Sequence, residues 1–489
     1  SNNTKHETSS SHQQVRETGS GSNCPVYRVK LPWQSDISRD GCHNARMAHV
    51  GRYIRNRAFW LKQNGARRGA AIEYKKLMRS QYLDTQDLQE LSLRQRRALI
   101  AHAATNSPFY REKYAEAGLE PNDICDERTW QSVPLLTREE LQSSFERIKS
   151  VGRYRTALST TGGSTGNPVA VLHDQSFHQE TLTWRMLKWW GCGPGDNAAF
   201  VWRGLDASHW NRVTNAIMWW PTRRARLDAR GLDVRRMSEF IKRFNALKPD
   251  YLQGYVGALL ELAKFAMSES SELHHPKAVW ATSSPLPEAS RSLIESVFAA
   301  PCYDQYGSCE VFSLAAECAE KRGLHANQDV RHLEFVNPTP DSAVGDVVVT
   351  DLRNFAFPLI RYQNGDQGSW WTDEPCGCGI HLPRIRPIKG RITENVRLSN
   401  GVVLTGETLT ALFDLHVDAA TAFQVEQTAQ DELLVRYVPK RAPNSLVESA
   451  IARQLRLASG GIAKVNIACV DTIQHEGGKF RYVKSLGGP

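Results

Sequence analysis

The chain has 489 residues, 41% of them hydrophobic, which is enough for a large core and more than one domain. Its 61 basic and 52 acidic residues give a net charge of +9, but no long block of like charges occurs, so we expect no nucleic-acid partner. No run approaches the ~18 apolar residues of a membrane span, and the start of the chain carries no secretory or transit signal. We therefore expect a cytoplasmic protein without a membrane partner.

The amino-terminal part is predicted to be a tail followed by helices. Residues 1–44 are polar and almost free of bulky apolar side chains, which predicts a disordered tail. Over residues 45–150, segments such as LSLRQRRALIAHAATNSPFYREKY carry apolar residues at helical spacing. The basic runs RYIRNR, ARRGA and PTRRARLDARGLDVRR are interpreted as solvated helix faces.

From about Ser150, short apolar runs alternate with helical segments. The expected buried strands are DNAAFVW, PDYLQGY, KAVWATSS and PCYDQYG, and the helices between them include SEFIKRFNAL and GALLELAKFA. This alternation predicts a doubly wound α/β body. After Glu334 the composition favours a β subdomain that includes GDVVVTDL and FPLIRYQNGDQGSWW.

The carboxy-terminal part reads as a smaller unit with its own core. The expected strands TAFQVEQ, ELLVRYVP and KVNIACV accompany one expected helix, SLVESAIARQLRLAS, which is the size of a small α+β domain. We predict a large domain at residues 45–390 and a small mobile domain at residues 391–489.

The segment STTGGSTGNPV, Ser159 to Val169, favours phosphate binding. Eight of its eleven residues are Gly, Ser or Thr, so hydroxyl groups and closely approaching backbone N–H groups are available as donors. It lacks the Lys-Ser/Thr ending of a Walker loop, and an ordinary polar turn is the alternative. The candidate ligands of the phosphates are Thr160, Thr161, Gly162, Gly163, Ser164, Thr165 and Gly166.

Four further motifs carry candidate chemistry, although each alone is also typical of an ordinary turn or surface charge. In PCYDQYGSCE, Tyr306 could pack on a purine for which Gly307 leaves room, and the Glu310 carboxylate could hold Mg²⁺. In PLIRYQNGDQG, Asp366 stands in a Gly-flanked turn and could accept hydrogen bonds from both ribose hydroxyls. IKGRITEN contains Arg391 at the expected domain boundary, and HEGGKFRYVKS presents Lys479 after a Gly-Gly pair.

Together, in this order, the five motifs resemble the superfamily of acyl-CoA synthetases, peptide-synthetase adenylation domains and luciferases. LSLRQRRALIAHAATNSPFYREKYAEAGLEPNDI, VPLLTREEL, LKPDYLQGYVGALLELA and TSSPLPEASR resemble the phenylacetate–coenzyme A ligase-like branch with its capsule-biosynthesis relatives. The resemblance covers roughly residues 90 to 485. It implies ATP and coenzyme A as substrates and Mg²⁺ as the cofactor.

The resemblance also implies a role for each matching residue. Thr161–Gly166 would hold the β- and γ-phosphates, Glu310 the Mg²⁺, Asp366 the ribose and Arg391 the ribose or phosphate. Lys479 would reach the α-phosphate, where negative charge develops as pyrophosphate leaves. The adenine pocket would be lined by Ser283, Ser284, Pro285, Asp304, Gln305 and Tyr306.

The chain departs from the family pattern at several positions. Cys309 replaces the usual Thr or Ser before the acid, and a thiol is a poorer donor than a hydroxyl. Asn167 stands where Lys is frequent, which removes one positive charge. After Arg391 the family usually has a pair of acids, and in this chain Thr393 and Glu394 stand at those two positions. These changes bear more on the thioester-forming step than on adenylation.

Cys318, His325, Cys376 and Cys378 predict a structural zinc site. Three thiolates and one imidazole form a standard tetrahedral set, although the C-x-C pair is tighter than the usual C-x₂-C. His381 is a rival ligand, and loop cysteines beside an unrelated histidine are the alternative interpretation. Some phenylacetate ligase-like proteins carry this arrangement with zinc, which favours the metal. The ten cysteines are otherwise scattered, so no disulfide framework is expected.

The predicted function is ATP-dependent conversion of a carboxylic acid into an acyl-adenylate, followed by transfer to coenzyme A. Transfer to an amine, a hydroxyl or a carrier protein remains an alternative, and a homodimer remains open. An inactive scaffold is disfavoured because four separated polar residues of the motifs are retained. A nucleic-acid binder is disfavoured because the basic residues are spread along the chain without a block of like charges. Tyr255 and Trp184 would line the acid pocket and favour an aromatic or apolar acid, with aromatic core packing as the alternative.

Overall fold

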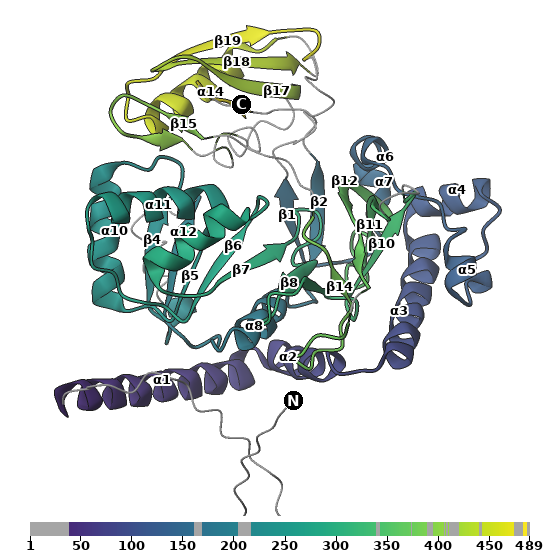
Figure 1. Cartoon of the computed structure of the whole chain (residues 1–489). Coiled ribbons are helices and arrows are strands. Elements are labelled where there is room, and N and C mark those ends of the chain that lie inside the picture. The colour runs from purple at the N-terminus through teal and green to yellow at the C-terminus, as the bar shows by residue number, and fades with distance from the viewer. Residues whose placement is uncertain are drawn as a thin grey trace, which may run out of the picture. The chain divides into compact units, whose positions relative to one another are not determined.

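The structure is a computed structural model (Figure 1) that describes residues 39–160, 169–203, 217–338, 343–372, 374–388, 395–404, 406, 409, 420–439, 443–473 and 483–486. For residues 39–49, 66, 421 and 422 it describes the backbone alone. Contacts divide the chain into residues 1–50 and 51–489. The division predicted at residue 391 falls among residues 389–394, which lie outside the described part.

The amino-terminal region is helical, as the spacing of its apolar residues predicts. Its helices are α1 (Arg39–Ala66), α2 (Arg68–Ser80), α3 (Thr85–Asn106), α4 (Pro108–Glu116), α5 (Glu127–Trp130), α6 (Arg138–Ser143) and α7 (Phe145–Ile148). The start of α6 is a capping box in which Thr137 and Glu140 each accept from the other's backbone N–H. Because α1 begins at Arg39, residues 39–44 are helical and do not belong to the expected tail.

A nine-stranded sheet forms the centre of the body. Its parallel strands are β3 (Ala198–Trp202), β4 (Arg224–Asp228), β5 (Tyr251–Tyr255), β6 (Ala278–Thr282) and β7 (Cys302–Tyr306). It continues antiparallel through β8 (Ala315–Glu317), β9 (Leu324–Ala326), β14 (Arg384–Ile385) and β13 (Trp370–Trp371). The strand order is β13-β14-β9-β8-β7-β6-β5-β3-β4.

Helices cover both faces of this sheet, which confirms the predicted doubly wound α/β class (Figure 1). Along β6, Val279 and Ala281 pack with α10 (Val234–Leu247), α11 (Val256–Ser268) and α12 (Glu288–Phe298). The alternate residues Ala278 and Trp280 pack with α8 (Glu180–Trp189) on the other face. The period-2 alternation of a strand thus buries both sides.

One basic run was misinterpreted as a helix face. Within PTRRARLDARGLDVRR, residues 224–228 form β4 at the edge of the sheet, and α10 begins only at Val234. Ala225 and Leu227 are buried while the alternate residues Arg224 and Arg226 are partly exposed, which is the two-residue period of a strand. Dense arginine concealed this alternation in the sequence.

Two smaller sheets complete the body. The antiparallel strands β10 (Arg331–Val336), β11 (Gly345–Asp351) and β12 (Tyr362–Gly368) form the predicted β subdomain. The hairpin of β1 (Thr156–Thr160) and β2 (Ala170–Asp174) flanks the segment predicted to bind phosphate. One buried cluster, which includes Val171, Val311, Leu333 and Val349, joins these sheets to the amino-terminal helices.

The carboxy-terminal region has its own sheet and core. The strands β17 (Ala420–Ala429), β18 (Glu432–Pro439), β19 (Lys464–Cys469) and β20 (Val483–Lys484) run in the order β19-β18-β17-β20. The helix α14 (Ser445–Ala458) packs on them through Ile451 and Leu455. Asn444 caps this helix by accepting from the backbone N–H groups of Leu446 and Val447. Before this sheet in sequence, β15 (Val396–Arg397) pairs with β16 (Val403–Leu404) in a separate two-stranded sheet.

Candidate active site

The candidate residues of the body gather at the carboxyl ends of parallel strands. Tyr255 is paired with Thr282, and Thr282 with Gln305, so β5, β6 and β7 end at the same edge of the sheet. The carboxyl edge of an open parallel sheet is where ligands bind in α/β proteins. The topology therefore brings the segments after Tyr255, Thr282 and Tyr306 together.

The predicted residues Tyr306 and Asp366 are in direct contact. The Tyr306 hydroxyl donates to Asp366 Oδ2 at 2.8 Å and accepts from Asn364 Nδ2 at 2.6 Å. Burial and the nearby Asp366 carboxylate raise the pKa of Tyr306 well above its usual value, so this hydroxyl keeps its proton. The contact holds a carboxylate at a fixed place beside the end of β7.

A local distortion of β12 orients Asp366. The register between β11 and β12 shifts between Asp346 and Val348, where more residues of β12 than of β11 lie between paired positions. Gly365, at φ +85°, occupies this irregular stretch in a conformation that favours glycine. Asp366 therefore lies in an irregular strand, whereas the sequence predicted a turn at this position.

Glu310 is buried in the loop that follows β7. Its Oε1 accepts from the Tyr362 hydroxyl at 3.3 Å and lies 3.5 Å from Arg138 Nη1. The backbone carbonyl oxygen of Cys309 lies 2.9 Å from His173 Nε2. A Cβ at Gly307 would come within 2.8 Å of the Ser313 backbone nitrogen, so this close turn requires glycine.

The predicted adenine-pocket residues follow β6 or end β7. Ser283 has φ +82°, a left-handed conformation that turns the chain sharply after the strand, and Ser284 and Pro285 follow. The Thr282 hydroxyl donates to Gln305 Oε1 at 2.8 Å, which fixes this amide between the two strands. Burial and the nearby Glu317 carboxylate raise the pKa of Asp304 to about 7.

The two aromatic residues predicted to contact the acid lie in packed clusters. The Tyr255 ring contacts Trp202 at 4.2 Å between centroids, close to the carboxyl end of β5. Trp184 makes edge contacts with Phe59, Trp60 and Tyr74 from α1 and α2. The contacts of Trp184 are those of the core-packing alternative, and within the described part of the chain none of its ring contacts reaches the strand-end residues.

Several predicted site residues fall outside the described part of the chain. These are Thr161–Gly166, with Asn167, and the carboxy-terminal residues Arg391, Thr393, Glu394 and Lys479. Thr160 is described: it ends β1 and pairs with Ala170 of β2, immediately before the predicted phosphate loop.

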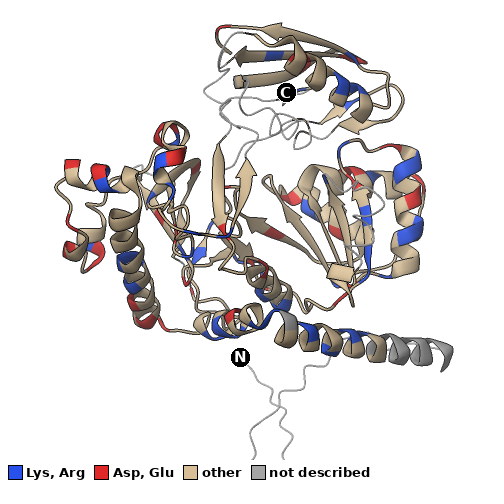
Figure 2. Cartoon of the chain, turned by 180° about the vertical axis from the view of Figure 1, so that it is seen from behind, with Lys and Arg blue, Asp and Glu red and all other residues tan. Residues whose placement is uncertain are grey.

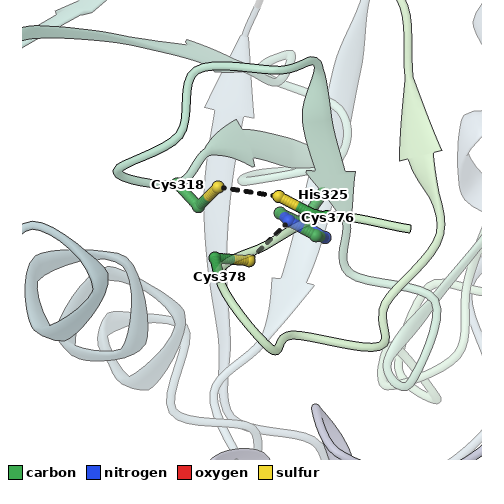
Figure 3. A group of neighbouring side chains, drawn as sticks. All are labelled: Cys318, His325, Cys376 and Cys378. Carbon is green, nitrogen blue, oxygen red and sulfur yellow. Dashed lines mark hydrogen bonds between the residues drawn. The ribbon is translucent and has the colours of Figure 1, made fainter. Parts of the chain in front are cut away.

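The four predicted zinc ligands come together at the other end of the central sheet (Figure 3). Cys318 follows β8, His325 lies in β9, and Cys376 and Cys378 belong to the loop between β13 and β14. Their ligand atoms all lie within 4.8 Å of one another. The rival ligand His381 is not in this group; its ring stands edge-on to Tyr82.

The chemistry of these side chains fits a tetrahedral metal ion. The Cys318 and Cys376 sulfur atoms lie 3.5 Å apart, close to the ~3.8 Å edge of a tetrahedron with zinc–sulfur bonds of about 2.3 Å. His325 Nδ1 lies 2.7 Å from the Leu382 carbonyl oxygen, an arrangement that directs the Nε2 lone pair toward Cys378. Burial lowers the pKa of His325 to about 4, so this ring is the neutral imidazole that metals bind.

Three residues that the sequence interpretation did not assign also contact the candidate site. Tyr362 and Asn364 stand at alternate positions before Asp366 in PLIRYQNGDQG. The two-residue period of a strand could have predicted that they lie on the same face as Asp366. Arg138 lies at the start of α6, far away in sequence. No local pattern could pair it with Glu310.

Sequence relatives share most of the length of the chain, although no family model matches it. Protein CapK of Staphylococcus aureus is 21% identical over 410 residues, which cover 81% of this chain and 89% of CapK. The phenylacetate-coenzyme A ligase of Thermus thermophilus is 26% identical over 338 residues, which cover 65% of this chain and 74% of that ligase.

A solved structure shows the fold. The crystal structure of 2-hydroxyisobutyryl-CoA ligase, in an open conformation with 2-HIB-AMP and CoA, matches with a TM-score of 0.55 and 21% identity. The match covers 83% of this chain and 93% of that ligase. The chain therefore has the fold of this ligase over that share of its length.

Proposed function

We propose that this chain, which belongs to the phenylacetate–coenzyme A ligase-like branch of the adenylate-forming enzymes, converts a carboxylic acid and ATP into an acyl-adenylate and pyrophosphate and then transfers the acyl group to a thiol. The strongest support from the site is the Tyr306–Asp366 contact beside the buried Glu310, at the carboxyl edge of the sheet. A nucleotide needs such a combination: a carboxylate for the ribose, an aromatic ring for the base and an acid for the metal.

In the first half-reaction, the acid's carboxylate attacks the α-phosphorus of ATP. Asp366 accepts from the ribose hydroxyls, and Glu310 would hold the Mg²⁺ that neutralises charge on the phosphates. Lys479 and the loop Thr161–Gly166 stabilise the charge that develops on the phosphate oxygens. These assignments rest on the resemblance and on the position of Glu310 and Asp366 beside β7.

In the second half-reaction, a thiol attacks the acyl carbon and AMP leaves. Coenzyme A is the proposed acceptor because the similar proteins 2-hydroxyisobutyryl-CoA ligase and phenylacetate-coenzyme A ligase are named for ligation to it. The small carboxy-terminal domain turns about Arg391–Glu394 and withdraws Lys479 between the two steps. A carrier-protein thiol, an amine or a hydroxyl is the alternative acceptor.

The test of the first step is acid-dependent exchange of labelled pyrophosphate into ATP. A library of aromatic, aliphatic and hydroxy acids is supplied one at a time, and mass spectrometry then looks for a product with coenzyme A, an amine or a hydroxyl compound. Exchange with at least one acid is expected. If no acid supports exchange although ATP binds, the chain is a scaffold and the proposal is wrong.

We also propose that Cys318, His325, Cys376 and Cys378 hold one structural Zn²⁺. Four protein ligands leave no open position for water, so the ion ties the loop between β13 and β14 to β8 and β9 and takes no part in the chemistry. Burial raises the pKa values of Cys318 and Cys378, and a bound cation is what would keep such thiols deprotonated.

A further inference from the structure

Two segments that are far apart in sequence expose apolar side chains next to each other. On α1, Tyr53, Ile54 and Leu61 lie on one helical stripe, and the exposed fraction of Leu61 is 74%. In the segment before β4, the exposed fractions of Ile217, Met218, Trp219 and Trp220 are 69%, 67%, 45% and 59%. We call these seven side chains the apolar patch.

Lys62 ties the two segments together. Its ammonium group donates to the backbone carbonyl oxygens of Ile217, Met218 and Trp220 at 3.2, 2.5 and 3.0 Å. Since Lys62 follows Leu61 directly, these bonds bring the exposed helix stripe beside the 217–220 segment. A soluble monomer seldom exposes bulky apolar side chains in such a group without a partner.

The surroundings of the patch are basic. Residues 41–72 contain seven Lys or Arg and no Asp or Glu, and residues 217–227 contain three Arg and no acid. In Figure 2 the ribbon of the described part of α1 is blue at its Lys and Arg positions. Asp196 and Asp250 pair with Arg52 and Arg55.

Other cations of this surface are not neutralised by acids. Arg57 lies over the Tyr53 ring, and Arg223 is exposed immediately before β4. Among the described residues, no carboxylate lies within ion-pair distance of Arg57, Lys62 or Arg223. The patch therefore presents aliphatic and aromatic groups inside a positive field.

We propose that this surface docks the protein on the face of an anionic lipid bilayer. Trp and Tyr rings partition to the boundary between headgroups and acyl chains, aliphatic side chains insert beside them, and Lys and Arg bind the lipid phosphates. The proposed contact lies at the bilayer surface, and no helix in the described part of the chain is both long and apolar enough to cross a bilayer. The sequence expectation of no membrane partner considered spanning segments and therefore did not test such a surface.

Charge complementarity favours this partner over the two others. In a symmetric dimer through the patch, Arg57, Lys62 and Arg223 of one copy would face the same cations of the other copy without acids to offset them. A polynucleotide would satisfy the positive charge but would leave Leu61, Ile217 and Met218 without an apolar environment. An anionic bilayer satisfies both properties at once.

The test is co-sedimentation of the full chain with vesicles. Vesicles of phosphatidylcholine alone are compared with vesicles that contain roughly 30% phosphatidylglycerol, at low and at high salt. We expect binding to the anionic vesicles that weakens as salt screens the charges, and much weaker binding to the neutral ones. Absence of binding to anionic vesicles at low salt overturns the proposal.

Two double variants separate the contributions. Arg57→Glu with Arg223→Glu should weaken binding to anionic vesicles at least about 25-fold, since each surface charge contributes about fivefold. Ile217→Ser with Leu61→Ser should weaken it about tenfold even at low salt. Leu446→Ser and Arg235→Glu, at highly exposed positions outside the patch, should leave it unchanged.

Adenylate formation in solution should be the same for all these variants, because none of the changed residues belongs to the candidate active site. An unchanged melting temperature excludes a folding defect. Equal vesicle binding by the patch variants and the native chain overturns the proposal. The proposal is also overturned if the native chain does not bind vesicles and instead forms a dimer in sedimentation velocity that the patch variants abolish. The same holds if the native chain does not bind vesicles and is retained on a polynucleotide column in a way that the patch variants abolish.

Discussion

At the scale of single residues, the site depends on one hydroxyl that performs two tasks. Tyr306 donates to Asp366 and accepts from Asn364, so it fixes the carboxylate proposed for the ribose. Removing the hydroxyl leaves the ring in place, takes one donor from Asp366 Oδ2, which then keeps the Asn364 Nδ2 donor at 3.3 Å, and leaves Asn364 with one acceptor fewer. The ring and the hydroxyl of Tyr306 can therefore be tested separately.

The variant Tyr306→Phe should raise the KM for ATP about fivefold, the equivalent of one net hydrogen bond of about 1 kcal/mol. The measurement is pyrophosphate exchange as a function of ATP concentration. Tyr303→Phe, three residues earlier in β7 and stacked on Trp190, is the matched control and should leave this KM unchanged. An unchanged KM in Tyr306→Phe would show that the contact with Asp366 does not support nucleotide binding.

Cys309 allows a second test at the residue scale, because the family pattern has a hydroxyl there. Cys309→Thr should keep or raise the adenylation rate by a few-fold, since a hydroxyl donates better than a thiol to developing phosphate charge. The rate of pyrophosphate release measures this. The rival idea is a nucleophilic Cys309 that captures the acyl group. An acyl thioester trapped on the native protein and absent from Cys309→Ala would establish that idea instead.

At the scale of elements, the proposed zinc ion joins the loop between two short strands to the neighbouring strands of the sheet. The strands β13 and β14 have only two residues each, and the loop that carries Cys376 and Cys378 runs between them. Short strands provide few ladder hydrogen bonds, so the loop depends on attachments beyond the ladder. Arg384 donates to the Glu374 carbonyl oxygen, and the His381 backbone N–H donates to the Gln81 carbonyl oxygen. A metal ion bound to β8, β9 and this loop would supply a further attachment.

Elemental analysis should therefore find about one zinc per chain, and Cys376→Ser should lower both the zinc content and the melting temperature. Cys125→Ser, at an exposed cysteine in the amino-terminal helical region, is the control and should change neither. Chelation should lower the melting temperature before it affects pyrophosphate exchange at low temperature, because the ion has no catalytic task. Protein that is free of metal and has an unchanged melting temperature would exclude the zinc site.

The elements also show where sequence reasoning succeeds. Apolar runs such as KAVWATSS correctly predict the parallel strands β3, β5, β6 and β7 of the central sheet. A strand that is buried on both faces is apolar along its whole length, so its sequence stands out. The edge strand β4 was missed because arginines occupy its partly buried alternate positions. The distortion of β12 that orients Asp366 was also missed, since a local shift in register leaves no pattern beyond Gly365.

At the scale of the whole molecule, the order of the motifs conveyed more than their local chemistry. Tyr306 and Asp366 are 60 residues apart in sequence, and only the topology joins them. The four metal ligands span a similar distance, but their donor chemistry is specific enough to group them without the fold. The acid pocket shows the opposite case, because aromatic residues such as Trp184 serve packing and recognition alike and the sequence cannot separate the two roles.

The last prediction concerns the two half-reactions and the carboxy-terminal region as a whole. Lys479 follows a Gly-Gly pair in a region with its own sheet and core, and its proposed role requires it to meet the body in only one of two arrangements. Lys479→Ala should lower acyl-adenylate formation about 10²- to 10³-fold, because a charge aimed at the α-phosphate is lost.

The same variant should release acyl-CoA from supplied acyl-adenylate at a rate close to that of the native chain, because the lysine is withdrawn in that step. Single-turnover measurements of each half separate the effects. Lys484→Ala, five residues further along in β20, is the control for a general disturbance of the region and should affect neither half. Equal losses in both halves for Lys479→Ala would mean that the lysine acts on folding or on a shared binding step, and a native rate of adenylate formation would remove it from the mechanism.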